Sequence, residues 1–202
     1  MTIHLVTYYP MILKARGRKA IKKYQLKPYI DHSIRREPNF DHDYPGISAL
    51  CRKSKLAPKL KIGDIVVYIT VKGKHERDTE RHHRLVAVLK VIEVCRDHET
   101  AAWWYQSRGY SPLPTNCIIS KSLQWDQTTL TEEQAEEAEA DYIKTANHWP
   151  NYIICEKVHM NLETPRAIYE NDWLSIIGRP TPNTLNKVNL TPEQYKQLCS
   201  FF

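Results

Sequence analysis

The two most apolar segments of the chain lie on either side of a loop that is almost entirely charged. They are "KIGDIVVYIT", residues 61–70, and "RLVAVLKVIEV", residues 84–94, and the loop between them is "VKGKHERDTERHH". Their β-branched and aliphatic residues predict two neighbouring strands, and the Gly63-Asp64 pair predicts a tight turn into the first. The loop is long for a hairpin connection, and its charges predict a solvent-exposed arm.

The second of these strands has two apolar faces, interrupted only by Lys90. Strict alternation assigns one face to Leu85, Ala87, Leu89 and Val91, and the other to Val86, Val88, Ile92 and Val94. A strand at the protein surface would alternate apolar with polar residues. We therefore expect this strand to be covered on both sides, as in a small barrel with helices packed outside.

Strand and helix patterns alternate along the rest of the chain. Further strands are predicted at residues 3–9, 116–120, 151–160 and 173–178. Helices are predicted in the basic segment around Ile12, Leu13, Ala20 and Ile21, and over residues 44–54, 131–146 and 191–202. The last two begin with a capping-box arrangement, in which a threonine is followed three residues later by glutamine. Residues 101–112, which are rich in aromatic residues, are interpreted as a loop.

This order of elements predicts an α+β fold built on a small, mainly antiparallel β-barrel flanked by helices. No linker rich in Pro, Gly or Ser divides the 202 residues. We expect one domain over residues 1–202, with helical insertions and a C-terminal helix.

Charge is distributed unevenly along the chain, which has a formal net charge of +6. Lys and Arg greatly outnumber Asp and Glu up to residue 74, whereas residues 131–141 form an acidic block. A basic half favours a phosphate-bearing partner such as DNA or RNA, although a solvated basic surface would have the same composition. No apolar run is long enough to span a bilayer, and the first residues do not resemble a secretion signal, so we expect a cytoplasmic protein without membrane contact.

Two pairs of potential metal ligands flank the second apolar strand. His82 and His83 precede it, and Cys95 and His98 follow it. A strand of about eleven residues separates the pairs by about 36 Å, which is too far for one zinc ion. The sequence therefore predicts no metal site, and it contains no glycine-rich loop for a nucleotide cofactor.

The segment "DHSIRREP", residues 31–38, combines carboxylate, hydroxyl, imidazole and guanidinium groups. Arg35 and Arg36 offer planar donors to phosphate or to a base edge, and Arg52 adds a third candidate for phosphate binding. A solvated surface is the alternative interpretation. Cys51 lies beside Arg52, but its helical spacing from apolar neighbours favours a buried, inert thiol over a nucleophile.

Trp103, Trp104 and Tyr105 form an aromatic cluster with two possible roles. The rings could fill the core, or one of the tryptophans could form the wall of a base-binding pocket, because bases stack on aromatic side chains. The other tryptophans are expected in the core: Trp125, Trp149 and Trp173.

The two apolar strands resemble those of the PUA-like superfamily, which includes EVE, ASCH and YTH domains. The shared pattern is a "xxGDxVVYxT" strand, a variable insert and an "xLVAVxxVxEV" strand. With "REPNFDHDYPGISALCR" before the Gly-Asp strand, the chain is most similar to nucleotide-modification-associated domains of phage and bacterial DNA-modification systems. The resemblance covers about 60 to 100 residues.

The resemblance implies a barrel with a pocket for a nucleobase, including a modified one. Thr70 occupies the place of a small hydroxyl residue that lies near this pocket in EVE-type members, and Trp103 or Trp104 would supply the aromatic wall. The leading hypothesis is a binding module for DNA or RNA that uses no cofactor.

Two alternatives remain open at the level of sequence. The first is an ASCH-type hydrolase, an amidohydrolase or nuclease, for which Thr70, Lys72 and Glu93 are available. The second is an interaction protein that docks through the acidic helix over residues 131–146. The sequence does not decide whether the protein is an enzyme.

Overall fold

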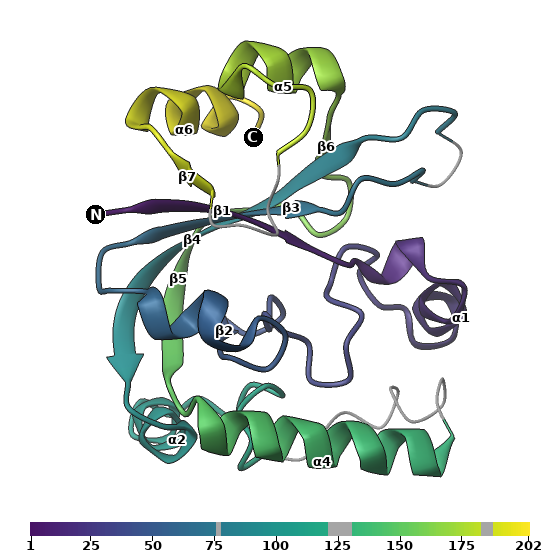
Figure 1. Ribbon diagram of the computed structural model, residues 1–202. Coiled ribbons are helices and arrows are strands. Elements are labelled where there is room, and N and C mark those ends of the chain that lie inside the picture. Colours follow the sequence, from purple (N-terminus) through teal and green to yellow (C-terminus); the bar gives the residue numbers. More distant parts are fainter. Residues whose placement is uncertain (76–77, 121–130, 183–187) are drawn as a thin grey trace.

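One seven-stranded sheet with helices on both sides organises the chain (Figure 1). The computed structural model describes residues 1–75, 78–120, 131–182 and 188–202. The strands are β1 Ile3–Tyr8, β2 Gly46–Ile47, β3 Ile65–Thr70, β4 His83–Cys95, β5 Tyr152–Met160, β6 Arg166–Ile168 and β7 Val188–Leu190. The helices are α1 Ala15–Tyr24, α2 His98–Gln106, α4 Glu132–His148, α5 Glu170–Ile177 and α6 Pro192–Cys199, with 3-10 turns at Met11–Leu13, Lys53–Lys55 and Ala57–Lys59.

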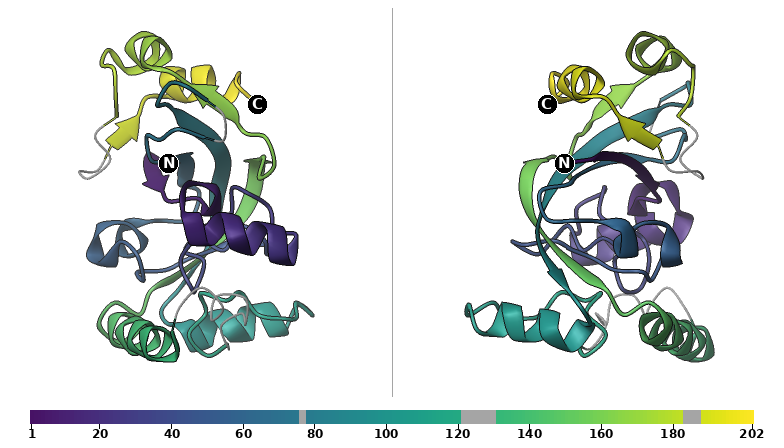
Figure 2. Two further views of the ribbon diagram at one scale, coloured as in Figure 1. Left: turned by 90° about the vertical axis from the view of Figure 1, so that its right-hand side faces the viewer. Right: turned by 60° about the vertical axis from the view of Figure 1, so that its left-hand side comes forward.

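The sheet is mixed but mainly antiparallel, as expected for the α+β class. Its strand order is β2-β5-β4-β3-β1-β7, and β6 pairs with the first part of β4. Only β1 and β3 run parallel among the described pairs. The order has two ends, β2 and β7, and no described pairing joins them. The predicted closed barrel is therefore not confirmed, and the described strands form an open, curved sheet (Figure 2).

The sheet is buried on both faces, which confirms the expectation for the two apolar strands. On one side, α5 and α6 pack against alternate residues of β1 and β3, among them Leu5 and Val67. On the other side, α1 and the long segment that follows it cover Tyr8, Val66 and Tyr68. Burial on both faces explains why these strands are almost continuously apolar.

The strict alternation predicted for β4 is wrong. Leu85 and Val88 face the side of α5 and α6, whereas Val86, Ala87 and Leu89 belong to the opposite core. The register between β3 and β4 shifts by one residue, because Tyr68 pairs with Ala87 but the next residue, Ile69, pairs with Leu85. A second shift, in the pairing of β4 with β5, lies between Val88 and Leu89. Each shift is a bulge that changes the face to which the following side chains point.

Two other segments differ from their predicted structure near the centre of the molecule. Residues 44–54 do not form a helix, because Gly46 and Ile47 pair with β5 as β2. The close approach requires glycine, since a Cβ at Gly46 would lie 1.8 Å from the hydroxyl of Tyr152. The aromatic segment forms α2 rather than a loop, and Asp97 caps it by accepting a hydrogen bond from the backbone N–H of Thr100 at 2.7 Å.

Predictions for the second half of the chain are mostly confirmed. The helices at α4 and α6 begin with the two predicted capping boxes, and β5 lies where a strand was expected. Residues 116–120 form turns instead of a strand, and residues 173–178 form the end of α5 and its C-cap, Gly178. No helix in the described ranges has the length and apolar character needed to cross a bilayer.

The Gly-Asp pair before β3 has a structural function. Gly63 adopts a φ of 86°, in the left-handed region that favours glycine, as predicted for the tight turn. The Asp64 carboxylate accepts hydrogen bonds from the backbone N–H groups of Thr2 at 2.6 Å and Lys61 at 3.1 Å. Asp64 thereby fixes the start of β1 beside the start of β3.

The arm between β3 and β4 is only partly exposed. Lys74, Glu80 and Arg81 are exposed as expected, but His75 and His82 are buried. The ring of His75 stacks on Tyr29 at a centroid distance of 5.7 Å. The described part of the arm therefore belongs to the core as much as to the surface.

Candidate functional site

A pocket of 480 Å³ opens where β1 and β3 end. The ends of these strands contribute Tyr8, Tyr9 and Tyr68, and the opposite wall comes from residues 31–37 and 48–56. Because β1 and β3 are parallel neighbours, their carboxyl ends meet at one edge and leave room for a ligand there. The volume lies within the range of about 300–1,000 Å³ that is typical of small-molecule sites.

Asp31 is the buried carboxylate at the base of one wall. It is 4% exposed, and its Oδ1 accepts hydrogen bonds from the backbone N–H of Ser33 at 2.8 Å, from the Ser33 hydroxyl, and from the backbone N–H of Glu37 at 3.2 Å. The bond from Ser33 two residues later is an Asx turn, which bends the chain around the carboxylate. All of these bonds within the described chain end on Oδ1, so Oδ2 is the atom left to meet a ligand.

Glu37 is the second buried carboxylate of the pocket, and it joins distant parts of the chain. Its Oε1 accepts a hydrogen bond from the backbone N–H of Ser48 at 2.6 Å. Its Oε2 accepts one from the Ser48 hydroxyl and one from the amide of Asn116, both at 2.8 Å. Asn116 also donates to the carbonyl of Gly46 at 2.8 Å. Glu37 therefore joins the two segments, residues 31–37 and 48–56, that form this wall of the pocket.

Burial makes both carboxyl groups weak acids. Desolvation raises the pKa of Asp31 to about 6, although the hydrogen bonds from Ser33 and Glu37 act in the opposite direction. Desolvation also raises the pKa of Glu37 to about 7, and the charge of Asp31 contributes to this shift. Near neutral pH, Asp31 is therefore mostly ionised, whereas Glu37 is protonated in part of the molecules. The pocket thus offers both hydrogen-bond acceptors and a hydrogen-bond donor.

These shifts predict that the contribution of Glu37 to stability falls as the pH rises from about 6.5 to about 8. A carboxyl whose pKa is higher in the folded state stabilises the fold below its unfolded pKa, and this contribution is lost as the pH rises through the folded pKa. For Glu37, we expect the free energy of unfolding to fall by about 1 kcal/mol over this interval. Urea titrations at several pH values measure it.

The Glu37→Gln variant serves as the reference, because it lacks the titrating group and should show no such decrease. Buried His32 and His75, whose pKa values are lowered to about 4 mainly by desolvation, have the opposite effect at lower pH, between about 4 and 6.5. The histidines contribute equally in the wild type and the variant, so the difference between the two curves isolates Glu37. Parallel curves for the wild type and the variant would contradict the assignment.

Aromatic and cationic side chains form the rim of the pocket. Tyr9 is 47% exposed, and its ring lies 5.6 Å from that of His32. Arg52, Lys53 and Lys55 come from the opposite side of the rim. The Lys14 ammonium lies over the Tyr9 ring, 4.6 Å from its centroid, so a planar ligand that stacks on this ring uses its other face or displaces Lys14. The anionic groups of such a ligand can reach the cations of the rim.

Of the three arginines predicted to bind phosphate, only Arg52 lines this pocket. It donates to the carbonyl of Thr7 and, at 3.3 Å, to the Thr7 hydroxyl, so it is held at the rim by β1. Arg36 adopts a φ of 46°, pairs with Asp41 and lines a separate cavity of 300 Å³. Arg36 is nevertheless near enough to Asp31 for its positive charge to lower the pKa of that carboxyl, against the larger effect of desolvation.

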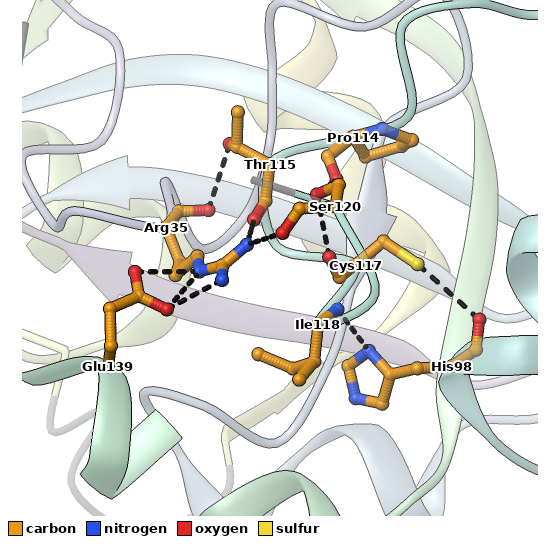
Figure 3. A network of polar contacts seen from close by, with 8 residues as sticks. All are labelled: Arg35, His98, Pro114, Thr115, Cys117, Ile118, Ser120 and Glu139. Carbon is orange, nitrogen blue, oxygen red and sulfur yellow. Dashed lines mark hydrogen bonds and ion pairs between the residues drawn. The ribbon is translucent and has the colours of Figure 1, made fainter. Parts of the chain in front are cut away.

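The guanidinium of Arg35 is buried and hydrogen-bonds other groups of the protein (Figure 3). It is 4% exposed, and its Nε and Nη2 donate to the carboxylate of Glu139 on α4 at 2.6 to 3.0 Å. Its Nη1 donates to the carbonyls of Thr115 at 2.8 Å and Ser120 at 2.7 Å. This geometry gives no support to a phosphate-binding role for Arg35.

Thr70 is fully buried and does not line the pocket. Its hydroxyl accepts a hydrogen bond from the backbone N–H of Arg84 at 2.9 Å and lies 3.3 Å from Nε2 of His75. Its carbonyl lies 2.7 Å from Nδ1 of His83. The pocket is lined by Tyr68, two residues before Thr70, and by Val71, the residue after it. The structure therefore assigns Thr70 a place in the core of the arm, and its predicted contact with a base remains untested.

Trp103 and Trp104 lie on α2, at the opposite end of β4 from Thr70. Trp104 is buried against Tyr44 and beneath Arg108, whose guanidinium carbon lies 4.2 Å from the ring centroid. Trp103 is 66% exposed on the surface of the helix. The structure does not bring either ring together with Thr70, and stacking of a base on these rings stays a prediction.

The residues considered for the hydrolase alternative also lie apart. Lys72 pairs with Glu170 at the surface, whereas Glu93, near the far end of β4, accepts a hydrogen bond from the next backbone N–H at 3.0 Å. Cys51 is exposed at the pocket instead of buried on a helix. Its thiol pKa is raised, first by desolvation and then by the carboxylates of Asp31 and Glu37, so the thiol is not activated.

The remaining candidates from the sequence fall into three groups. Trp173 is buried in the core as expected, Trp149 is only half-buried, and Trp125 lies outside the described residues. The acidic helix is present as α4, of which only Thr145 and Ala146 are buried. Its docking role remains a prediction. Within the described ranges, no three potential ligand side chains are grouped so that they could hold a metal ion.

The sequence singled out a segment that lines the pocket, but the predicted role went to its arginines and not to its carboxylates. The concentration of polar groups in residues 31–38 was visible, and the pocket takes Asp31, His32, Ser33 and Glu37 from it. The usable signal was the Asp-x-Ser spacing of an Asx turn. Tyr9, at the end of the first strand, was not recognised because its exposure depends on where that strand stops.

Comparisons with known proteins give no match. No family model matches the chain, and neither the curated proteins nor the solved structures contain a match to it.

Proposed function

We propose that the protein binds a nucleobase of DNA or RNA, including a modified base, in the pocket around Asp31 and Glu37. The observation that carries the proposal is the combination, in one pocket, of a buried carboxylate with an uncommitted oxygen, an exposed aromatic ring and a cationic rim. Each feature matches one part of a nucleotide. Proteins hold flipped or single-stranded bases by the same combination of hydrogen bonds and stacking.

The base edge would meet Asp31. Its Oδ2 accepts an amino or ring N–H when ionised and donates to a carbonyl when protonated, and its pKa of about 6 makes both forms accessible. Tyr9 would stack on the base, and Arg52 and Lys55 would meet the phosphates. The hydroxyls of Ser33 and Ser48 already bond the carboxylates and orient them.

The relationship to PUA-like domains is part of the proposal. The two strands that carry the resemblance lie side by side as β3 and β4, and the pocket opens at the end of β3. The similarity to nucleotide-modification-associated domains favours a modified base as the ligand and a cytoplasmic location. In this proposal the base meets Asp31 and Tyr9 rather than Thr70 and a tryptophan.

Binding of short single-stranded oligonucleotides tests the proposal. We expect fluorescence anisotropy to show binding that weakens steeply with salt, because Lys and Arg displace counterions from phosphates. Asp31→Asn should weaken binding at least about tenfold, since hydrogen bonds to charged groups contribute about 1.5–3 kcal/mol. Plain and base-modified oligonucleotides are compared in DNA and RNA form.

Asp43→Asn is the matched control, because Asp43 is exposed in the same part of the chain and does not line this pocket. Its binding should equal that of the wild type. The proposal fails if no plain or modified oligonucleotide binds at low salt, or if Asp31→Asn and Asp43→Asn behave alike.

Hydrolysis of the bound nucleotide is a second candidate function, favoured by one observation. Two carboxyl groups with pKa values of about 6 and about 7 share the pocket, as in enzymes that use general acid and base catalysis. Chromatography of nucleosides and oligonucleotides incubated with the protein separates the two functions. Product that disappears with Asp31→Asn supports hydrolysis, and ligand recovered unchanged supports a binding module.

A further inference from the structure

A second cavity adjoins the pocket at the end of α4. Its volume is 500 Å³, and α4 and the residue after it contribute Asp141, Lys144, His148 and Trp149. The 3-10 turn Lys53–Lys55 forms the opposite side through Lys53. The proposed base-binding function assigns no role to this cavity.

Lys53 is common to both cavities. It lines the pocket around Asp31 and the cavity at α4, and it therefore lies on the ridge between them. Its φ is 48°, a left-handed conformation that is uncommon for a residue other than glycine. The backbone N–H of Lys53 donates to the carbonyl of Ala49 at 2.7 Å, which holds this conformation. Residues in such conformations concentrate at ligand-binding sites.

The second cavity has the chemistry of a nucleotide site. Trp149 is half-buried and meets the ring of His148 edge-on at 4.3 Å, so its position is fixed by a neighbour. Lys53 and Lys144 are exposed cations, against the single carboxylate of Asp141. An aromatic ring and two lysines in one cavity suit a base with its phosphates.

The two cavities are also connected through the interior. Arg35 lies in the segment that forms one wall of the first pocket, and it is joined to Glu139 in the middle of α4 (Figure 3). The helix that carries Lys144 is thereby fixed relative to Asp31. The distance between the cavities is then a fixed property of the fold.

We propose that the two cavities are consecutive subsites for one strand of single-stranded nucleic acid, an inference that rests on the proposed base-binding function. One base enters the pocket at Asp31, the adjacent base stacks on Trp149, and Lys53 meets the phosphate between them. The ligand is then at least a dinucleotide, and a free nucleoside occupies only half of the site.

Affinities for a mononucleotide and for di- and trinucleotides of the same base test this inference by calorimetry, in DNA and RNA form. We expect the wild type to bind the dinucleotide at least about fivefold more tightly than the mononucleotide, the lower limit for one stacked base. Trp149→Leu should abolish this gain and leave the mononucleotide affinity unchanged. Lys144→Gln, at an exposed position, should lower the slope of log K against log salt by about 0.7 for the longer ligands.

Phe202→Leu and Lys22→Gln are the matched controls, because both residues are exposed and line neither cavity. Both should leave the gain intact. The second subsite is overturned if the wild type binds the dinucleotide no more tightly than the mononucleotide, or if the gain in affinity survives both Trp149→Leu and Lys144→Gln. In either case, binding of the mononucleotide would still support the proposed function. Absence of binding by every ligand overturns both.

Discussion

Replacing Arg35 by alanine should lower the free energy of unfolding by about 3 kcal/mol, near the lower end of the range for breaking a buried ion pair. The guanidinium is 4% exposed and bonds two carbonyls and the carboxylate of Glu139. Its removal leaves the carbonyls of Thr115 and Ser120 without this donor. Because the Glu139 side chain is 25% exposed, water can solvate its carboxylate, which keeps the loss below the upper end of the range.

Urea denaturation measures the effect, with Arg179→Ala as the control for removing an exposed arginine. The control should change stability by no more than about 0.5 kcal/mol. Amide hydrogen exchange adds a local measurement, since α4 should lose protection before β4 does. Equal stability of the two variants would show that Arg35 does not fasten α4.

Replacing Glu37 by alanine is expected to have a similarly large effect, a loss of about 2–4 kcal/mol in the free energy of unfolding together with loss of oligonucleotide binding. Three buried donors, the backbone N–H and hydroxyl of Ser48 and the amide of Asn116, lose their acceptor. An unsatisfied buried donor costs about 1–3 kcal/mol. The net loss is smaller than the sum, because the desolvation cost of the carboxyl also disappears.

Glu163→Ala removes an exposed glutamate and serves as the control for Glu37→Ala. It should leave stability and binding unchanged. If Glu37→Ala keeps wild-type stability and binding, the hydrogen bonds to Ser48 and Asn116 do not form the pocket wall.

Local signals in the sequence predicted much of the fold. Each capping box at Thr131 and Thr191 depends on residues three positions apart, and both helices begin where these boxes lie. The faces of β4 could not be predicted in the same way, because its bulges depend on the register with β3 and β5. Residues 173–178 were assigned to a strand from their composition, but packing of Trp173 and Ile176 against the sheet favours a helix there.

The site was less predictable than the fold. The polar segment at residues 31–38 was recognisable, but which side chains face the pocket depends on the left-handed backbone at Arg36 and on the distant partner Glu139. Arginines suggested phosphate binding by their chemistry alone. The second cavity joins Lys53 to Trp149, and no local pattern relates residues so far apart in the sequence.

The position of β1 has a consequence for folding during synthesis. β1 lies between β3 and β7, so its pairing of Ile3 with Leu190 connects residues that are very far apart in the sequence. Until the ribosome has released residues 188–190, one edge of β1 has no β7 to pair with, and an unpaired strand edge can associate with other chains. Contacts between such distant residues also form slowly. The nascent chain therefore completes this part of its sheet only after residues 188–190 have been synthesised.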